Sequence, residues 1–149
     1  MNKILMIEEE VEMIEKVHSR LSHAGFEILS ASDGQHGLQI AKDKSPDLII
    51  TDANIPKMSG YEFCKAIKND LNTKSIPIVV LTEKHRMEES FMYLGVHDFL
   101  NKPFSMDELE VMVRKKLNLS QCMHILKSKI LINGRPEVLL CCQELLKKT

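Results

Sequence analysis

Short apolar runs alternate with amphipathic stretches along most of the chain, and this alternation predicts the fold. The apolar runs are rich in β-branched residues and lack polar alternation, as is typical of strands covered on both faces. We expect five such strands, at residues 3–7, 26–31, 47–51 and 76–82, with a shorter one within 97–104.

The segments between these runs carry apolar residues at helical spacing. In the first of them the spaced residues are Val11, Ile14, His18, Leu21 and Ala24, and Gly25 supplies a stop. Three later helices are expected to begin at capping boxes, formed by Ser32 with Gln35, Ser59 with Glu62, and Ser105 with Glu108. The helix after the fourth strand has a weaker apolar stripe and is expected to end at Gly95.

This order of elements determines the fold class that we expect. Strands joined by helices pair in parallel through right-handed crossovers. We therefore predict a three-layer α/β domain over residues 1–119, a doubly wound five-stranded parallel sheet of the flavodoxin-like kind. Residues 120–149 break the pattern, and we expect a short C-terminal extension with a hairpin around Asn133–Gly134. This extension is either a packing or dimerising tail or the start of a truncated output region.

Composition and charge narrow the class of protein. The 149 residues, 44% of them hydrophobic, suffice for one domain with its own core. No run approaches the roughly 18 apolar residues of a membrane span, and the N-terminus lacks a signal sequence, so we expect a cytoplasmic protein. A net charge of −1 argues against nucleic-acid binding through this chain alone. The four cysteines have neither metal-site nor disulfide spacing.

Polar residues follow the predicted strands at the sheet edge where parallel sheets bind ligands. They are Glu8, Glu9 and Glu10 after the first strand, Asp52 after the third, Thr82 after the fourth and Lys102 after the fifth. Each alone has an ordinary explanation, as a turn former, a solvated surface group or, for Glu10, an acidic first turn of a helix. Clustered carboxylates repel one another unless a cation relieves them, so the set indicates a divalent cation such as Mg²⁺.

This set of groups suits phosphoryl transfer. A carboxylate can attack a phosphoryl group and form an acyl phosphate, and it needs no general base because it is already ionised at neutral pH. A metal ion, an ammonium group and a hydroxyl can stabilise the transferring oxygens.

Four segments, in order along residues 2–119, resemble the receiver domain of two-component response regulators. They are "KILMIEEE", "PDLIITDANIPKMSG", "IPIVVLT" and "GVHDFLNKPF". The resemblance implies that Asp52 accepts a phosphoryl group from a sensor histidine kinase or a phosphotransfer protein. It also implies a Mg²⁺ or Mn²⁺ site formed by Glu8, Glu9, Asp52 and the backbone carbonyl of Asn54.

The resemblance further implies a switch rather than an enzyme, with at most slow self-phosphorylation and dephosphorylation. Lys102 and the Thr82 hydroxyl would contact the phosphoryl oxygens. Phe99 would turn inward when Thr82 moves, although a plain core aromatic is the alternative for Phe99. Residues 84–119 would then bind a downstream protein, an output domain or a second copy of the chain.

Glu9 departs from the family pattern, in which the acidic pair is usually Asp-Asp or Glu-Asp. A Glu at this second position extends the carboxylate by about 1 Å, whereas Mg²⁺ demands near-ideal octahedral geometry. We therefore expect that Glu9 binds through water, that the loop shifts, or that metal affinity falls.

Three other functions compete with the phosphorylated switch. A pseudo-receiver would bind proteins without metal or phosphorylation. A truncated DNA-binding regulator would need a recognition helix, which residues 120–149 lack. A flavin- or nucleotide-binding protein of the same fold would need a phosphate cradle after the first strand, where this chain has three glutamates.

Overall fold

The computed structural model describes residues 2–83 and 88–129, with side chains described up to residue 117. Its strands are β1 (Lys3–Ile7), β2 (Glu27–Ala31), β3 (Leu48–Asp52), β4 (Ile78–Thr82) and β5 (Asp98–Asn101). Its helices are α1 (Val11–His23), α2 (Gly34–Lys44), α3 (Gly60–Asn69), α4 (Glu88–Met92) and α5 (Met106–Lys129). The chain divides into two compact units, residues 1–110 and 111–149. The first unit contains all five strands.

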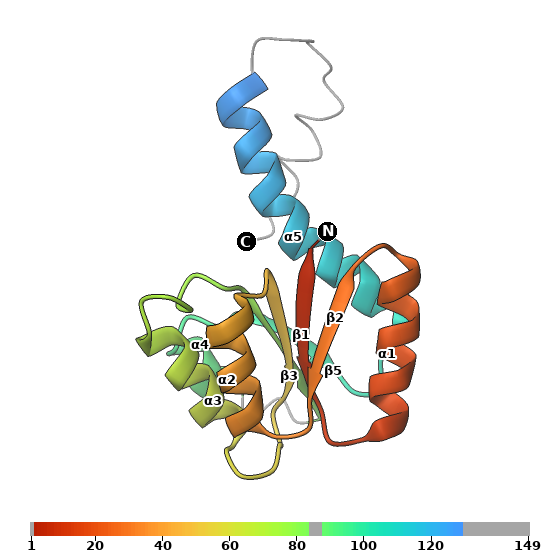
Figure 1. Cartoon of the computed structure of the whole chain (residues 1–149), viewed down its shortest axis with the longest axis vertical. Coiled ribbons are helices and arrows are strands. Elements are labelled where there is room, and N and C mark those ends of the chain that lie inside the picture. The colour runs from red at the N-terminus through yellow and green to blue at the C-terminus, as the bar shows by residue number, and fades with distance from the viewer. Residues whose placement is uncertain (1, 84–87, 130–149) are drawn as a thin grey trace. The chain divides into compact units, whose positions relative to one another are not determined.

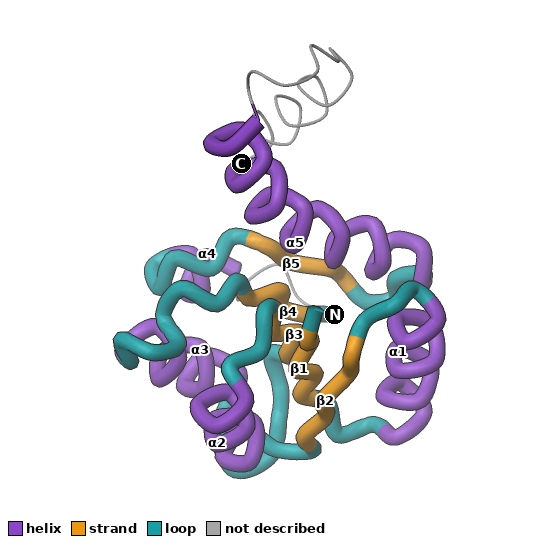
Figure 2. Tube along the Cα trace, turned by 45° about the horizontal axis from the view of Figure 1, so that its top comes forward, coloured by secondary structure: helices purple, strands orange, loops and turns teal. Residues whose placement is uncertain are grey.

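The five strands form one parallel sheet in the order β2-β1-β3-β4-β5. Helix α1 covers one face, and α2, α3 and α4 cover the other (Figures 1 and 2). The predicted doubly wound α/β fold is therefore confirmed. The strand order reverses direction between β1 and β3, and ligands of such sheets bind outside the carboxyl ends of the strands at this point.

The three central strands form the most deeply buried part of the sheet. Every residue of β3 and β4 is buried, as is every residue of β1 except Lys3. The edge strands β2 and β5 are partly exposed, because each pairs with a neighbour on one side alone. The carboxyl ends of β1, β3 and β4 are thus fixed by packing on both faces of the sheet.

Two of the three predicted helix starts agree with the structure. The Ser59 hydroxyl accepts from the Glu62 N–H and the Glu62 carboxylate returns to the Ser59 N–H, so the capping box is complete. The Ser105 hydroxyl accepts from the Glu108 N–H at 3.1 Å. The prediction for Ser32 was wrong, because Asp33 is the N-cap of α2 and accepts from the His36 N–H at 2.8 Å.

The last two helices differ in length from the prediction: α4 is shorter and α5 is longer. Helix α4 is a five-residue helix, and Gly95 follows it with a φ of 83°, a conformation that suits glycine. Helix α5 continues past residue 119 to Lys129. The hairpin expected around Asn133–Gly134 lies outside the described residues. None of the described helices is long and apolar enough to span a membrane.

Candidate functional site

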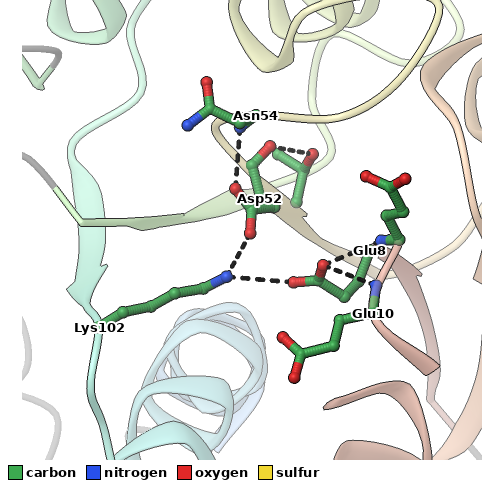
Figure 3. A network of polar contacts seen from close by, with 7 residues as sticks. Glu8, Glu10, Asp52, Asn54 and Lys102 are labelled. Carbon is green, nitrogen blue, oxygen red and sulfur yellow. Dashed lines mark hydrogen bonds and ion pairs between the residues drawn. The ribbon is translucent and has the colours of Figure 1, made fainter. Parts of the chain in front are cut away.

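Three of the predicted site residues meet at the carboxyl edge of the sheet. Glu8 follows β1, Asp52 ends β3 and Lys102 follows β5 (Figure 3). The Lys102 ammonium group lies between the two carboxylates: it is 3.3 Å from Glu8 Oε2, and it forms a hydrogen bond and ion pair with Asp52 Oδ2. One cation therefore joins residues that are 94 and 50 positions away from it in sequence.

Glu8 is a buried carboxylate whose two oxygens have separate partners. Its Oε1 accepts from the backbone N–H groups of Glu9 at 2.9 Å and Glu10 at 3.1 Å, while its Oε2 faces Lys102. Burial raises the pKa of Glu8, and the charge of Asp52 adds to this, against the opposing effects of the Glu10 N–H and Lys102. The folded protein therefore holds this carboxylate at an energetic cost.

The carboxylate of Asp52 is held by its own loop as well as by Lys102. Its Oδ1 accepts from the Asn54 N–H at 2.8 Å, which is the pattern of an Asx-turn. Behind it, the Gly60 N–H donates to the Ala53 carbonyl at 3.1 Å. A Cβ on Gly60 would lie 2.7 Å from the backbone oxygens of both Asp52 and Ala53, so glycine is required at this close approach.

Lys102 remains protonated in this arrangement. Burial lowers its pKa, but the hydrogen bond and charge of Asp52, together with the charge of Glu8, outweigh this effect, and the net shift is upward. Its backbone N–H donates to the Thr82 carbonyl at 2.9 Å, so the end of β4 positions the residue that follows β5. The peptide bond between Lys102 and Pro103 is cis.

Thr82 lies at this edge, whereas Phe99 lies earlier in its strand, opposite Val80. Thr82 is the buried last residue of β4. Phe99 is half-buried in β5 and packs edge-on against Phe91, with ring centroids 6.1 Å apart. Phe91 in turn packs edge-on against Tyr61 at 6.0 Å. Phe99 is thus one end of a row of three aromatic rings, and its role as a switch stays a prediction.

The oxygen donors at this edge suit a hard divalent cation in their chemistry. Glu8 and Asp52 converge on one ammonium group, and Mg²⁺ is commonly held by one or two carboxylates with waters and phosphate oxygens. Glu9 and Glu10, by contrast, are exposed. Within residues 2–83 and 88–117, no three His, Cys, Asp or Glu side chains gather closely enough to hold a metal ion.

Sequence reasoning missed the cleft beside Lys102. This cleft has a volume of about 550 Å³, and its lining residues are Met13, Lys16, Glu83, Lys102, Pro103 and Phe104. They come from α1, from the residue after β4 and from the segment before α5. The spacing of Met13 on α1 gave no signal of this cleft, because the lining residues from the other segments lie between Glu83 and Phe104, far along the chain.

Comparison with known proteins places these features in a family. The family model described as response regulator receiver domain matches residues 4–114. A probable transcriptional regulator of Porphyridium aerugineum, ycf27, is 34% identical over 117 residues, which are 77% of this chain and 48% of the relative. The chain thus spans about half the length of such regulators. Other relatives include histidine kinases.

Solved structures agree with this assignment. The chemotaxis response regulator CheY4 of Vibrio cholerae has a TM-score of 0.75 and 31% identity, covering 78% of this chain and 99% of that one. The receiver domain of the sensor histidine kinase PA1611 from Pseudomonas aeruginosa shares the fold with a TM-score of 0.73 and 24% identity, covering 78% of this chain and 98% of that one. That structure is described with a magnesium ion in its active-site cleft.

Proposed function

The chain belongs to the response regulator receiver domain family, and we propose that it is a signalling switch that accepts a phosphoryl group on Asp52. The observation that carries the proposal is the Asp52 carboxylate, which ends a buried strand and shares the Lys102 ammonium group with Glu8. A sensor histidine kinase or a phosphotransfer protein is the donor that this proposal requires.

The proposed reaction needs little from the protein besides position and charge. An Asp52 carboxylate oxygen attacks the phosphorus of a phosphohistidine, the new P–O bond forms as the P–N bond breaks, and the donor imidazole keeps the electron pair. Lys102 stabilises the negative charge on the transferring oxygens from a fixed position. The Thr82 hydroxyl, at the end of the neighbouring strand, is proposed as a further partner of these oxygens.

Receiver domains generally bind Mg²⁺, and Glu8, Asp52 and the Asn54 carbonyl are the groups that would hold it here. When bound, the ion supplies charge neutralisation for the phosphoryl oxygens. Mn²⁺ has the same ligand preference. Glu9 is exposed in the structure and would join through its longer side chain or through water.

Receiver domains pass their signal to a partner, and the relatives suggest two kinds. Regulators that match this chain over about half of their own length support an output domain or a downstream protein. Relatives among the histidine kinases support a kinase as the upstream partner, and we propose that the protein acts in the cytoplasm. We propose that Thr82 and Phe99 carry the change to residues 84–119, which then bind that partner or a second copy of the chain.

Incubation with acetyl phosphate and Mg²⁺, followed by intact mass measurement, tests the proposal. We expect a gain of one phosphoryl group in the wild type and none in Asp52→Asn. The exposed Asp43→Asn variant is the matched control and is expected to gain the group as the wild type does.

A pseudo-receiver is the second candidate, and the exposure of Glu9 is the observation that favours it. In that case the wild type would remain unmodified at any Mg²⁺ concentration, while Glu9→Asp would gain the phosphoryl group. That pair of results would replace the switch by a phosphorylation-independent interaction domain.

A further inference from the structure

The loop that leaves Asp52, residues 53–59, is strained at its tip; we call it the acceptor loop. Lys57 has a φ of 66°, a value that residues with a Cβ rarely adopt. The Met58 N–H donates to the Pro56 carbonyl two residues earlier, at 2.7 Å. A three-residue turn with positive φ is rare, and such a conformation persists where surrounding contacts hold it.

The contacts that hold this tip come from the start of α2, about 20 residues earlier in the chain. The Gly34 N–H donates to the Pro56 carbonyl at 3.4 Å. The Lys57 ammonium group lies 3.4 Å from Asp33 Oδ2. The two segments are also in direct contact, because a Cβ on Gly34 would lie 2.8 Å from Met58 Cβ.

Asp33 uses its two carboxylate oxygens for different purposes. Oδ1 accepts from the His36 N–H and caps α2, while Oδ2 faces Lys57. The side chain of Asp33 is 14% exposed and that of Lys57 is 63% exposed, so the carboxylate is fixed and the lysine reaches it from the loop. The His36 N–H, followed by Lys57, lowers the pKa of Asp33, which keeps it ionised.

The base of the acceptor loop belongs to the site already described. The Asn54 N–H holds Asp52 Oδ1, and the Gly60 N–H closes the loop on Ala53. With the base fixed to β3, the remaining freedom of the loop lies in its tip. Asn54 lies between this fixed base and the tip, so contacts at both ends restrain its peptide group.

We propose that Asp33 is a positioning residue for the phosphoacceptor site: together with Lys57 it fastens the acceptor loop to α2 and so sets the geometry of Asn54 beside Asp52. The inference rests on the proposed function for its consequence in metal binding and phosphoryl transfer. It rests on the geometry alone for the fastening itself.

Three variants separate this role from ordinary surface electrostatics. Asp33→Asn keeps an oxygen to cap α2 and removes the charge that holds Lys57. Lys57→Gln removes the other partner. Lys42→Gln is the matched control, because Lys42 also lies on α2 and makes an exposed ion pair, with Asp70 at 3.9 Å, away from the site.

The first measurement is the ¹⁵N–¹H amide spectrum of the metal-free protein. If the pair fastens the loop, the Asn54 and Ala53 amide signals move in Asp33→Asn and in Lys57→Gln, and stay in place in Lys42→Gln. Unmoved Asn54 signals in both variants would overturn the proposal. This result does not depend on phosphorylation, so it decides the fastening even if the wild type accepts no phosphoryl group.

The second measurement is the Mg²⁺ concentration at half-saturation, followed by the rate of phosphorylation by acetyl phosphate. Loss of positioning weakens Mg²⁺ binding in both variants, by about twofold to fivefold given the usual strength of an exposed ion pair. A purely electrostatic effect would have opposite signs in the two variants. Loss of the Asp33 carboxylate would weaken Mg²⁺ binding, and loss of the Lys57 ammonium group would strengthen it. Opposite signs, or no change in either variant, would overturn the positioning role, and Lys57→Arg should restore the wild-type value.

Discussion

Two places in the described part of residues 1–110 hold one cation between two carboxylates, and they differ in depth. We call them the buried triad and the surface triad; they are Lys102 with Glu8 and Asp52, and Arg20 with Asp107 and Glu110. The side chains of the buried triad are 17%, 5% and 11% exposed, and those of the surface triad are 37%, 80% and 23% exposed. The same charges thus stand in two different environments.

The difference in depth indicates different uses. The free energy lost when buried charges leave water can exceed the free energy gained from their attraction. Stability is therefore a poor explanation for the buried triad. Burial raises the pKa of Glu8, as this desolvation cost would. In the surface triad, the hydrogen bonds of Asp107 and Glu110 raise the pKa of Arg20. That triad joins α1 to the start of α5 at little cost, and exposed pairs contribute little stability.

Removing the cation of the buried triad should have the largest effect. In Lys102→Met, Glu8 and Asp52 face each other without a counter-charge, and the transferring oxygens lose a fixed positive group. We expect phosphorylation by acetyl phosphate to slow by about 100-fold, as when one preorganised donor is removed. Initial rates from intact mass spectra measure this.

The control for this variant is Lys42→Met, which removes an exposed lysine of α2 that pairs with Asp70 away from the site. It should leave the rate near that of the wild type. A Lys102→Met rate within about threefold of wild type, well below the effect of a typical catalytic donor, would show that the buried triad is not the chemical site.

The second effect in size concerns Glu9, the carboxylate that lies next to the buried triad and outside it. Shortening it in Glu9→Asp should bring a ligand back to the family spacing. The Mg²⁺ concentration at half-saturation should then fall by about threefold to tenfold, because octahedral Mg²⁺ is sensitive to ligand placement. Calorimetric Mg²⁺ titration measures this. A wild type that saturates no later than Glu9→Asp would contradict the expectation.

The contrast between Glu8 and Glu9 also shows where sequence reasoning ends. The alternation of strands and helices indicates a parallel sheet, whose strands all end at one edge, so the meeting of Asp52 with Lys102 could be predicted. Which of two adjacent glutamates turns inward could not. Glu8 turns inward because its Oε1 accepts from two backbone N–H groups, and this geometry exists only once the loop has formed.

Helix boundaries show the same limit on a local scale. Ser59 and Glu62 sit beside no competing capping residue, and their capping box was predicted correctly. Ser32 and Asp33 are both good caps, and the choice between them depends on where β2 ends, at Ala31. Helix α5 continues to Lys129 because residues 118–129 contain no glycine or proline to stop it, although the pattern of alternating elements has ended by then.

The third prediction concerns the pH dependence of stability, which tests the cost of burying Glu8 in the buried triad. Because the pKa of Glu8 is raised in the folded protein, the folded state binds more protons than the unfolded state above the ordinary carboxyl range. The contribution of Glu8 to the free energy of unfolding is therefore fully present below the pKa of Glu8 in the unfolded chain. It is lost as the pH rises through the pKa of Glu8 in the folded protein. Lys102, whose pKa is also raised, loses its contribution at alkaline pH alone.

Urea unfolding of the metal-free protein between about pH 4 and pH 8 tests this sign, since that range spans the carboxyl titrations. The wild type should lose stability relative to Glu8→Gln as pH rises, with most of the change in the lower half of the range. Glu12→Gln, an exposed carboxylate on α1, is the control. Parallel curves for the wild type and Glu8→Gln would remove the evidence that burial strains the triad.

The smallest effect is expected from the surface triad, and it completes the comparison. Arg20→Gln removes a cation that hydrogen-bonds to Glu110 through Nε at 3.1 Å and pairs with Asp107. Its urea midpoint should fall slightly at low salt, and the difference should shrink at about 1 M salt, where the Debye length is about 3 Å. Phosphorylation should be unchanged, because the proposed reaction uses no group of this triad. If Arg20→Gln slowed phosphorylation as strongly as Lys102→Met, depth of burial would not be what separates a chemical site from a structural contact in this protein.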